Sequence, residues 1–366
     1  MTHVRLKRLR VIPELRAQQV LESLDMTPCQ VMYFGENYDL GSARIPPNFV
    51  KVGLGRAVFT LLLSEADVLE VPEPLWLRFL PKNVVLLLAW RIGCLTTGKP
   101  RYTVTYAIEN NDLDTLVGGG KKVPRWFVRA FSTILGRFMS VMFTRIAFGS
   151  DAARATYARL ALRPTVVTRL FEELPVAQVL GREVPPAHAY GVVFVGRLEE
   201  RKGVRELMTA WPEVEAIVPA AVLTLLGNGV LQEDVFVWAN ARPASRRALG
   251  RIEHDQVGSI VAANSVLVAP SIPWGRWKEQ IGLPIVEGLS HGLTIVTSTE
   301  TGVATWLRAN GHQVVETADL EKCLGPAILN ALTNPLARES VRRSLPETDR
   351  RTDADRWLHA DLGSDR

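Results

Sequence analysis

The sequence has little cysteine and no long hydrophobic run. Its three cysteines, Cys29, Cys94 and Cys323, form no CxxC pair, which argues against a disulfide scaffold or a zinc ribbon and favours a reducing compartment. The longest clean apolar run, residues 84–90, is far shorter than the ~20 residues that span a bilayer. No apolar segment follows the basic residues at positions 5–10, so we expect no secretory signal and a cytoplasmic location.

Acidic residues are outnumbered by basic ones. With 43 Lys and Arg against 38 Asp and Glu, the net charge of +5 favours an anionic partner, whether phosphate, nucleic acid or an acidic membrane. A hydrophobic share of 47% and a charged share of 22% exclude the disordered and fibrous classes. The length of 366 residues favours about two domains.

Short β-branched runs alternate with helical patterns along most of the chain, which is typical of parallel βαβ units. The strands expected in the first half are residues 30–35, 67–71, 101–108, 145–148 and 165–169. Those expected in the second half are residues 191–195, 221–226, 247–252, 265–269, 293–297 and 313–315. We therefore predict an α/β fold of two Rossmann-like, doubly wound parallel-sheet domains that face each other across a cleft, where ligands usually bind.

A proline-containing stretch with few periodic signals separates the two halves. The predicted limits are an N-terminal domain at 1–174, a linker at 175–189 and a C-terminal domain at 190–336. Residues 337–366 are rich in arginine and predict a C-terminal helix with a polar tail.

The most informative segment is KEQIGLPIVEGLSHG at 278–292, between two expected strands. Gly282 and Pro284 mark a loop that becomes a helix, because proline suits the first helical turn. Free backbone amides and the helix dipole make such a turn an anion site. Glu279 precedes the turn and Glu287 follows it, so the two carboxylates would contact different parts of one bound ligand.

A second segment, GRLEERKG at 196–203, directly follows the expected strand at 191–195. Arg197 and Lys202 therefore lie between the carboxyl end of a strand and a helix. A guanidinium and an ammonium at such a position suit a diphosphate, because they offset the charge that builds on a departing phosphate.

These two segments, with LGNG at 226–229 between them, resemble the retaining glycosyltransferases of the GT-B fold, specifically the large family 4 (glycosyl transferases group 1). In that family a Gly-Arg…Lys-Gly element grips the donor diphosphate, and a Glu-x7-Glu element follows, with the spacing of Glu279 and Glu287 here. The resemblance covers residues 190–306 and extends weakly over the first half. It implies that a nucleoside-diphosphate sugar binds the C-terminal domain, while the N-terminal domain serves the acceptor.

The resemblance also implies roles for individual residues. Arg197, Lys202 and Glu279 would be catalytic: the two cations would contact the diphosphate, and Glu279 would hold the donor sugar. Glu287 would hold the ribose hydroxyls. The other implied donor-binding residues are Gly196, Gly227, Ile252, Glu253, Gly282, Leu283 and Pro284.

The implied activity is a hexosyltransferase reaction in glycan or polysaccharide biosynthesis, with a glycan or a lipid-linked acceptor. Transfer would proceed with retention by front-face attack, in which the leaving phosphate helps to deprotonate the acceptor. The family needs no metal, and no cofactor besides the sugar-nucleotide co-substrate is implied. Catalysis would then be mainly positioning and electrostatics.

The first half departs from the family pattern, since it lacks a Gly-Gly loop after its opening strand and the donor-facing histidine of many members. Glu109 and Asn110 stand at the equivalent strand end and become candidates for donor-sugar or acceptor contact. Asp112-Leu113-Asp114 looks like an Asp-x-Asp metal motif, but Asp353-Ala354-Asp355 shows how easily that pattern arises, so we interpret both as chance.

The segment 125–145 carries an apolar stripe at helical spacing opposite several arginines. The stripe consists of Phe127, Phe131, Leu135, Phe138 and Met142. One interpretation is a helix on an anionic membrane surface, which would make the protein peripheral on the inner face of the membrane. The other, which we favour, is a helix packed on the first-domain sheet.

Rival functions remain open at this stage. Another GT-B enzyme, such as a sugar-nucleotide epimerase or a glycan phosphorylase, would share the fold. A degenerate family member would bind a sugar nucleotide without catalysis. Nucleic-acid binding is not expected, since no recognition motif accompanies the basic charge.

Overall fold

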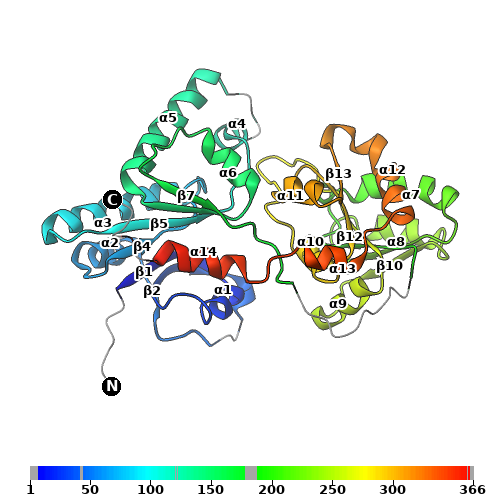
Figure 1. Cartoon of the computed structure of the whole chain (residues 1–366), viewed down its shortest axis with the longest axis horizontal. Helices are drawn as coiled ribbons and strands as arrows, with labels where there is room; N and C mark the ends of the chain where they lie inside the picture. The colour runs from blue at the N-terminus through cyan, green and yellow to red at the C-terminus, as the bar shows by residue number, and fades with distance from the viewer. Residues whose placement is uncertain are drawn as a thin grey trace. The chain divides into compact units, whose positions relative to one another are not determined.

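The computed structural model describes residues 7–41, 44–119, 121, 123–177, 188–360 and 362. The chain forms two compact units (Figure 1). The first comprises Met1–Gly149, Ala153–Glu172 and Arg350–Arg366, and the second comprises Ser150–Ala152 and Glu173–Asp349. Most of the predicted linker, residues 178–187, lies outside the described residues.

The first unit is built on a parallel sheet, with seven strands in its described part, in the order β3-β2-β1-β4-β5-β6-β7. The strands are β1 (Arg8–Leu15), β2 (Gln30–Glu36), β3 (Phe49–Lys51), β4 (Val68–Glu70), β5 (Tyr102–Ala107), β6 (Arg145–Phe148) and β7 (Val167–Leu170). The chain runs outward from β1 to β3 and then restarts on the other side at β4. This reversal is the mark of a doubly wound Rossmann-like sheet.

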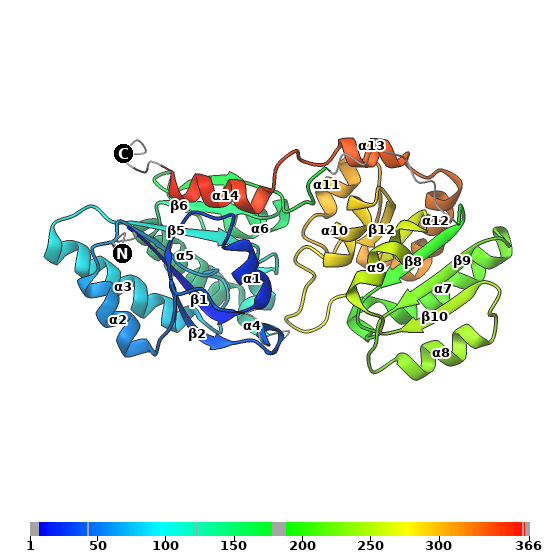
Figure 2. The ribbon, with the colours of Figure 1, turned by 90° about the horizontal axis from the view of Figure 1, so that it is seen from below.

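Helices cover both faces of this sheet (Figure 2). They are α1 (Ala17–Glu22), α2 (Leu54–Leu63), α3 (Leu80–Thr97), α4 (Leu113–Gly118), α5 (Arg125–Met142), α6 (Asp151–Ala158) and α14 (Arg350–His359), with a 3-10 turn η1 (Tyr38–Leu40). The buried sides of α2, α3, α5 and α6 share one core with one face of the sheet. Helices α1 and α14 pack on side chains of the opposite face.

The second unit repeats the plan, with six parallel strands in its described part, in the order β10-β9-β8-β11-β12-β13. The strands are β8 (Gly191–Val195), β9 (Val222–Leu226), β10 (Arg246–Gly250), β11 (Val266–Ala269), β12 (Thr294–Ser298) and β13 (Gln313–Val315). The order reverses between β8 and β11, so the loops that follow these two strands emerge side by side.

Two helical layers enclose the second sheet. The helices are α7 (Val204–Ile217), α8 (Gln232–Asn240), α9 (His254–Ala262), α10 (Leu283–Ser290), α11 (Ala304–Ala309), α12 (Leu320–Thr333) and α13 (Arg338–Arg343), with 3-10 turns η2 (Glu200–Lys202) and η3 (Thr317–Asp319). Helices α7, α8 and α12 pack on one face, and α9, α10, α11 and α13 on the other. Alternate residues of β8 enter the two cores, as expected for a strand buried on both faces.

The eleven expected strands are confirmed to within two residues at either end, and the predicted pair of doubly wound sheets is confirmed. Strands β1 and β3 were not predicted. β1 is central in its sheet, but arginines at positions 8 and 10 interrupt its apolar pattern. Arg10 is tolerated there because acidic partners far away in the sequence neutralise it, and Arg8 donates a hydrogen bond to the carbonyl of His359.

The C-terminal helix α14 supplies one of these partners. The buried Arg10 guanidinium pairs with Glu70 at 2.6 Å and also with Asp355 of α14. The imidazole of His359 lies 3.0 Å from the same Glu70 carboxylate, and Arg351 lies 3.3 Å from it. The arginine-rich end of the chain therefore belongs to the first unit rather than forming a tail on the second.

Helix α5 packs against the first sheet, as the favoured interpretation of its apolar stripe requires. Leu135 is buried, and Phe131, Phe138 and Met142 are partly buried against the same core. Phe127 is 44% exposed, so the stripe as predicted includes one residue that does not belong to the core.

Candidate active site in the second unit

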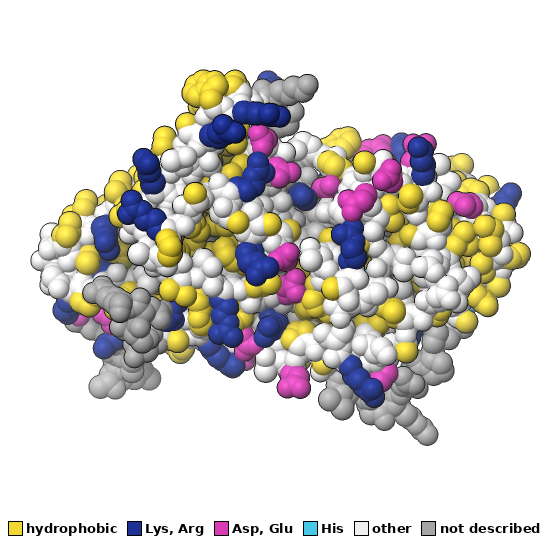
Figure 3. Space-filling model, turned by 45° about the horizontal axis from the view of Figure 1, so that its top comes forward, with side chains coloured by type: hydrophobic (Ala, Val, Ile, Leu, Met, Phe, Trp, Pro, Cys, Tyr) yellow, Lys and Arg dark blue, Asp and Glu magenta, His cyan; other side chains and the backbone are white. Residues whose placement is uncertain are grey.

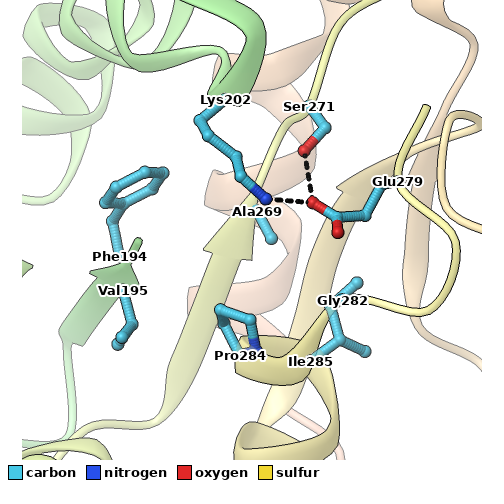
Figure 4. Close-up of a pocket in the computed structure, with 9 residues that line it drawn as sticks. All are labelled: Phe194, Val195, Lys202, Ala269, Ser271, Glu279, Gly282, Pro284 and Ile285. Atoms are coloured by element: carbon cyan, nitrogen blue, oxygen red, sulfur yellow. Dashed lines mark hydrogen bonds and ion pairs between the residues drawn. The ribbon is translucent and has the colours of Figure 1, made fainter. Parts of the chain in front are cut away.

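The second unit has a pocket at the point where its strand order reverses (Figure 4). It is lined by Phe194, Val195, Lys202, Ala269, Ser271, Glu279, Gly282, Pro284 and Ile285. These residues come from the ends of β8 and β11, from turn η2, from the loop between β11 and α10, and from the start of α10. Such a switch point is the usual ligand site of a doubly wound sheet.

A close backbone approach brings Lys202 into the pocket. The next residue, Gly203, has φ +68°, and a Cβ atom there would lie 1.9 Å from the carbonyl oxygen of Pro270. Only glycine fits this position without a shift of the backbone. The amide of Ile272 donates to the carbonyl of Arg201 at 3.0 Å, which ties the loop after β11 to turn η2.

Lys202 and Glu279 form an ion pair inside the pocket. Their side chains are 16% and 17% exposed, and the hydroxyl of Ser271 lies 3.3 Å from the same carboxylate oxygen. Figure 4 shows the three polar side chains pointing toward one another beside the start of α10. The Lys202 ammonium also lies 4.8 Å from the ring centroid of Trp277, a cation–π contact. The cation is thus held in place by partners on two sides.

Helix α10 starts at the edge of the pocket, as the loop-to-helix pattern predicted. Gly282 precedes its first residue, and Pro284 lies in its first turn. The first turn of a helix leaves amide groups outside helical hydrogen bonding, and the helix dipole makes this end favourable for an anion. The pocket therefore combines a half-buried ammonium with the positive end of a helix, which is the electrostatic requirement of a phosphate site.

Arg197 does not line the pocket. Its guanidinium pairs with Glu199 at 2.7 Å, and Arg201 pairs with the other oxygen of that carboxylate at 2.8 Å. The hydrogen bond from Arg197 lowers the pKa of Glu199 below its ordinary value despite partial burial. The Arg201 guanidinium in turn stacks 4.3 Å from the ring centroid of Trp277. The result is a chain of charged groups along the loop after β8.

Gly196 and Gly227 shape the backbone beside the pocket. A Cβ atom on Gly227, which has φ +139°, would lie 1.7 Å from the carbonyl oxygen of Gly196. The loops after β8 and β9 therefore touch backbone to backbone. Gly227 allows this close backbone contact because it has no side chain, and the same lack of a side chain would let a ligand approach the backbone.

The remaining predicted donor residues lie around the same end of the second sheet but do not line the pocket. Ile252 and Glu253 lie in the loop between β10 and α9, and Leu283 is 72% exposed at the start of α10. Glu287 lies one turn further along α10, and its carboxylate oxygen is 3.7 Å from where a Cβ of Gly258 would stand on α9. The structure thus brings Lys202, Glu279, Gly282 and Pro284 together, and sets Glu287 against the neighbouring helix.

The two candidates in the first unit, Glu109 and Asn110, are buried in the loop after β5. The Glu109 carboxylate accepts hydrogen bonds from the amide and the side chain of Asn111, at 3.0 and 2.8 Å. A neighbouring carboxylate, Glu73, accepts from the amide of Ile108 at 2.7 Å and from the hydroxyl of Tyr157. Burial raises the pKa of Glu73 to about 7. Sequence analysis missed Glu73, although its place between two prolines after a strand was a usable signal.

Among the described residues, Glu70, Asp355 and His359 offer metal-ligand atoms within 4.8 Å of one another. Arg10 pairs with both carboxylates, so a guanidinium already holds the centre of this group. The three side chains form the network that docks α14, and nothing in their donor set calls for a metal ion.

Sequence analysis also missed two residues at the pocket. Ser271 ends the apolar run of β11, and Trp277 stands two residues before Glu279. A polar residue at a strand end and an aromatic beside a basic segment were the signals that could have identified them.

The family comparison agrees with this location. Residues 189–334 match the model of a family described as glycosyl transferases group 1, and this range lies within the second unit and contains the whole pocket. A solved structure, Anabaena Alr3699/HepE in complex with UDP, superposes with a TM-score of 0.63 over 98% of this chain and 97% of that one, at 15% identity. The chain has the GT-B fold, and residues 189–334 are similar to the glycosyl transferases group 1 family.

Curated relatives match part of the chain. The GDP-mannose-dependent monoacylated alpha-(1-6)-phosphatidylinositol monomannoside mannosyltransferase of Corynebacterium glutamicum is 28% identical over 147 residues, 40% of this chain and 38% of the relative. The glycogen synthase of Mycobacterium tuberculosis is 28% identical over 156 residues, 42% of this chain and 36% of the relative. These matches span less than half the length of each relative.

Proposed function

We propose that the protein is a retaining glycosyltransferase that moves a hexose from a nucleoside-diphosphate sugar to a glycan or lipid-linked acceptor. The observation that carries this proposal is the pocket at the β8/β11 switch point. There the half-buried Lys202 ammonium faces the positive end of α10, and the Glu279 carboxylate lies beside it. The donor pyrophosphate would bind between the lysine and the helix.

Donor binding would rearrange the ion pair. A pyrophosphate offers Lys202 a stronger anionic partner than one carboxylate, because several oxygens carry its charge. Glu279, released from the ammonium, would then accept hydrogen bonds from hydroxyls of the donor sugar. In the absence of donor, the pair keeps both charges neutralised in a half-buried position, where an unpaired charge would be costly.

The reaction proposed is front-face substitution at the anomeric carbon. The bond between that carbon and the β-phosphate oxygen breaks, and a bond to the acceptor oxygen forms on the same face. The acceptor proton passes to the leaving phosphate oxygen, so no side chain acts as a nucleophile. Lys202 and the α10 dipole would offset the charge on the leaving diphosphate without a metal ion. Arg197, if it exchanges Glu199 for phosphate, would add to this effect.

The nucleoside would extend from the pocket toward α9. Glu287, which lies against that helix, would accept from the ribose hydroxyls, and the loop with Ile252 and Glu253 would border the base. Similarity to a GDP-mannose-dependent mannosyltransferase and to a glycogen synthase supports a hexose donor. A lipid-linked acceptor would require the protein to act at a membrane surface.

The proposal is tested by a thermal-shift panel of nucleoside diphosphates and their sugars, followed by transfer assays with the donor that stabilises the protein. Ligand that binds only the folded state raises the melting temperature by mass action. Lys202→Ala and Glu279→Gln should each lower transfer at least ~100-fold, the scale of losing one charge-stabilising group. The matched control is Lys322→Ala, at an exposed lysine of α12.

Wild-type turnover in both pocket variants would refute the site assignment. Donor binding with neither transfer nor slow donor hydrolysis would refute catalysis and identify a sugar-nucleotide-binding protein instead.

A further inference from the structure

Helix α3 exposes a continuous apolar stripe. Its members are Val85, Leu88, Ile92 and Leu95, with exposed fractions of 41%, 45%, 50% and 78%. The spacing of three, four and three residues places all four on one side of the helix. The opposite side, with Leu86 and Trp90, is buried in the core of the first unit. The stripe is therefore an outer surface that nothing in the described structure covers.

Helices α2 and α5 extend this surface. Phe59 and Leu63 of α2 are 64% and 65% exposed, and Trp126, Ile134 and Val141 of α5 are 70%, 70% and 53% exposed. All three helices bury their inner sides in one core on the same face of the sheet, so their outer sides face away from it together. Helices α2 and α3 lie side by side (Figures 1 and 2). We call the outer sides of these three helices the α2–α3–α5 face.

The charges of this face have a single sign. The three helices contain no Asp or Glu, although about one residue in ten of the whole chain is acidic. Their basic residues are all exposed: Arg56, Lys82, Arg91, Arg125, Arg129 and Arg137. Figure 3 shows dark blue and yellow side chains beside one another over the part of the first unit that includes α5. An ordinary solvated surface intersperses both signs of charge.

We propose that the α2–α3–α5 face binds the surface of an anionic lipid bilayer. Exposed aliphatic and aromatic side chains enter the interface between headgroups and acyl chains, while lysine and arginine contact anionic headgroups. None of the described helices is long and apolar enough to cross a membrane, so the contact lies in the plane of the interface. A second copy of the chain is a poor occupant, because two such faces would bring cations against cations without a carboxylate between them.

The residues that would contact lipid differ from those that the amphipathic pattern of α5 alone predicts. Leu135 and Met139 of that helix are buried in the core. The exposed apolar residues are instead Trp126, Ile134 and Val141, on the side that carries Arg137. The surface is thus recognised by exposure across three helices, which no single helical pattern shows.

Vesicle flotation of the full chain tests the proposal. Vesicles of phosphatidylcholine mixed with phosphatidylglycerol should float the protein, vesicles of phosphatidylcholine alone should do so at least tenfold less, and added salt should weaken binding. The double variant Leu88→Glu/Ile92→Glu, and separately Arg129→Gln/Arg137→Gln, should each reduce flotation at least tenfold. The control is Val230→Glu/Val237→Glu, at two valines of the second unit that are 81% and 73% exposed. Circular dichroism confirms that each variant is folded.

Three results would overturn the proposal: no flotation at low salt, equal loss in the control and in the α3 variant, or full binding by both variants of the face. If the wild type instead self-associates and Leu88→Glu/Ile92→Glu abolishes that association, the face is an interface between copies. Flotation requires no sugar nucleotide. Its failure would therefore leave the proposed transferase function standing, and inactivity of the pocket variants would leave the membrane surface standing.

Discussion

Glu73 should make the first unit less stable as the pH rises through the neutral range. Its carboxylate accepts hydrogen bonds from the amides of Leu75 and Ile108, at 3.1 and 2.7 Å, and from the hydroxyl of Tyr157. Burial and the charge of Glu109 nevertheless raise its pKa from 4.5 to about 7, because they outweigh these donors. The folded protein therefore keeps a proton on Glu73 at pH values where the unfolded chain has lost it.

The sign and size follow from proton linkage. Between pH 4.5 and about 7 the folded state binds one proton more than the unfolded state, so the free energy of unfolding falls as the pH rises. One pKa unit corresponds to about 1.4 kcal/mol, which gives a loss of about 3 kcal/mol across the window. Above about pH 7 the loss of unfolding free energy is complete and no longer changes with pH. Below pH 4.5 the contribution of Glu73 to the free energy of unfolding does not change with pH.

Glu73→Gln removes the titration and retains the shape of the side chain. We expect the free energy of unfolding of the variant, relative to wild type, to improve by about 3 kcal/mol between pH 4.5 and 8. Urea denaturation at a series of pH values measures this difference, with Glu65→Gln, at an exposed glutamate, as the control. A difference between Glu73→Gln and wild type that does not change with pH would refute the reasoning. Because Glu73 also binds the amide of Glu109, the same variant tests whether the loop with the first-unit candidates depends on it.

Three further predictions concern the stability of the two units. Asp355→Ala should lower the free energy of unfolding by about 3–5 kcal/mol, because it removes one carboxylate partner of the buried Arg10 guanidinium. Chemical denaturation measures this loss, and an unchanged denaturation midpoint would contradict the docking role of α14. Burial lowers the pKa of His312 to about 4, so between pH 4 and 6.5 the unfolded chain binds one proton more and the free energy of unfolding should rise with pH. The variant His312→Gln should abolish this rise. If the rise persists in the variant, another group causes it. Gly227→Ala should lower the melting temperature of the second unit, because the new Cβ would lie 1.7 Å from the Gly196 carbonyl oxygen. A melting temperature equal to that of the wild type would show that the loops after β8 and β9 can separate.

The second unit was the easier half to predict because the sequence predicts each of its six described strands, and the central strands β8 and β11 are apolar throughout. β8 and β13 have the predicted ends, and Val192 to Val195 of β8 alternate between the two cores before Gly196 ends the strand. β1 escaped prediction for the opposite reason. Its Arg10 has the character of a surface residue in the sequence, and the buried carboxylates that make it a core residue are Glu70, 60 residues away, and Asp355 of α14, 345 residues away. No local pattern carries that information.

The candidate site also contains a contact between distant segments that no local sequence pattern reveals. The spacing in the sequence brought Lys202 and Glu279 to one pocket, but it assigned both to a ligand and did not anticipate that they pair with each other. That contact joins loops 77 residues apart and depends on the backbone approach at Gly203. Arg197 was assigned to the same anion on the strength of its neighbours in sequence. Glu199, only two residues away, competes for its guanidinium.

The two units treat an acidic residue near their switch points in opposite ways. In each sheet the strand order reverses beside the first strand, and a glutamate lies in the loop that follows the strand across that point: Glu73 after β4 and Glu279 after β11. Burial and the nearby Glu109 disfavour the charge of Glu73, and its hydrogen bonds with Tyr157 and with the amide of Ile108 shape the loop after β5. Glu279 instead faces an ammonium that can move to another anion. Only the second arrangement can release a carboxylate when a phosphate arrives, which is why we propose the second unit as the donor site.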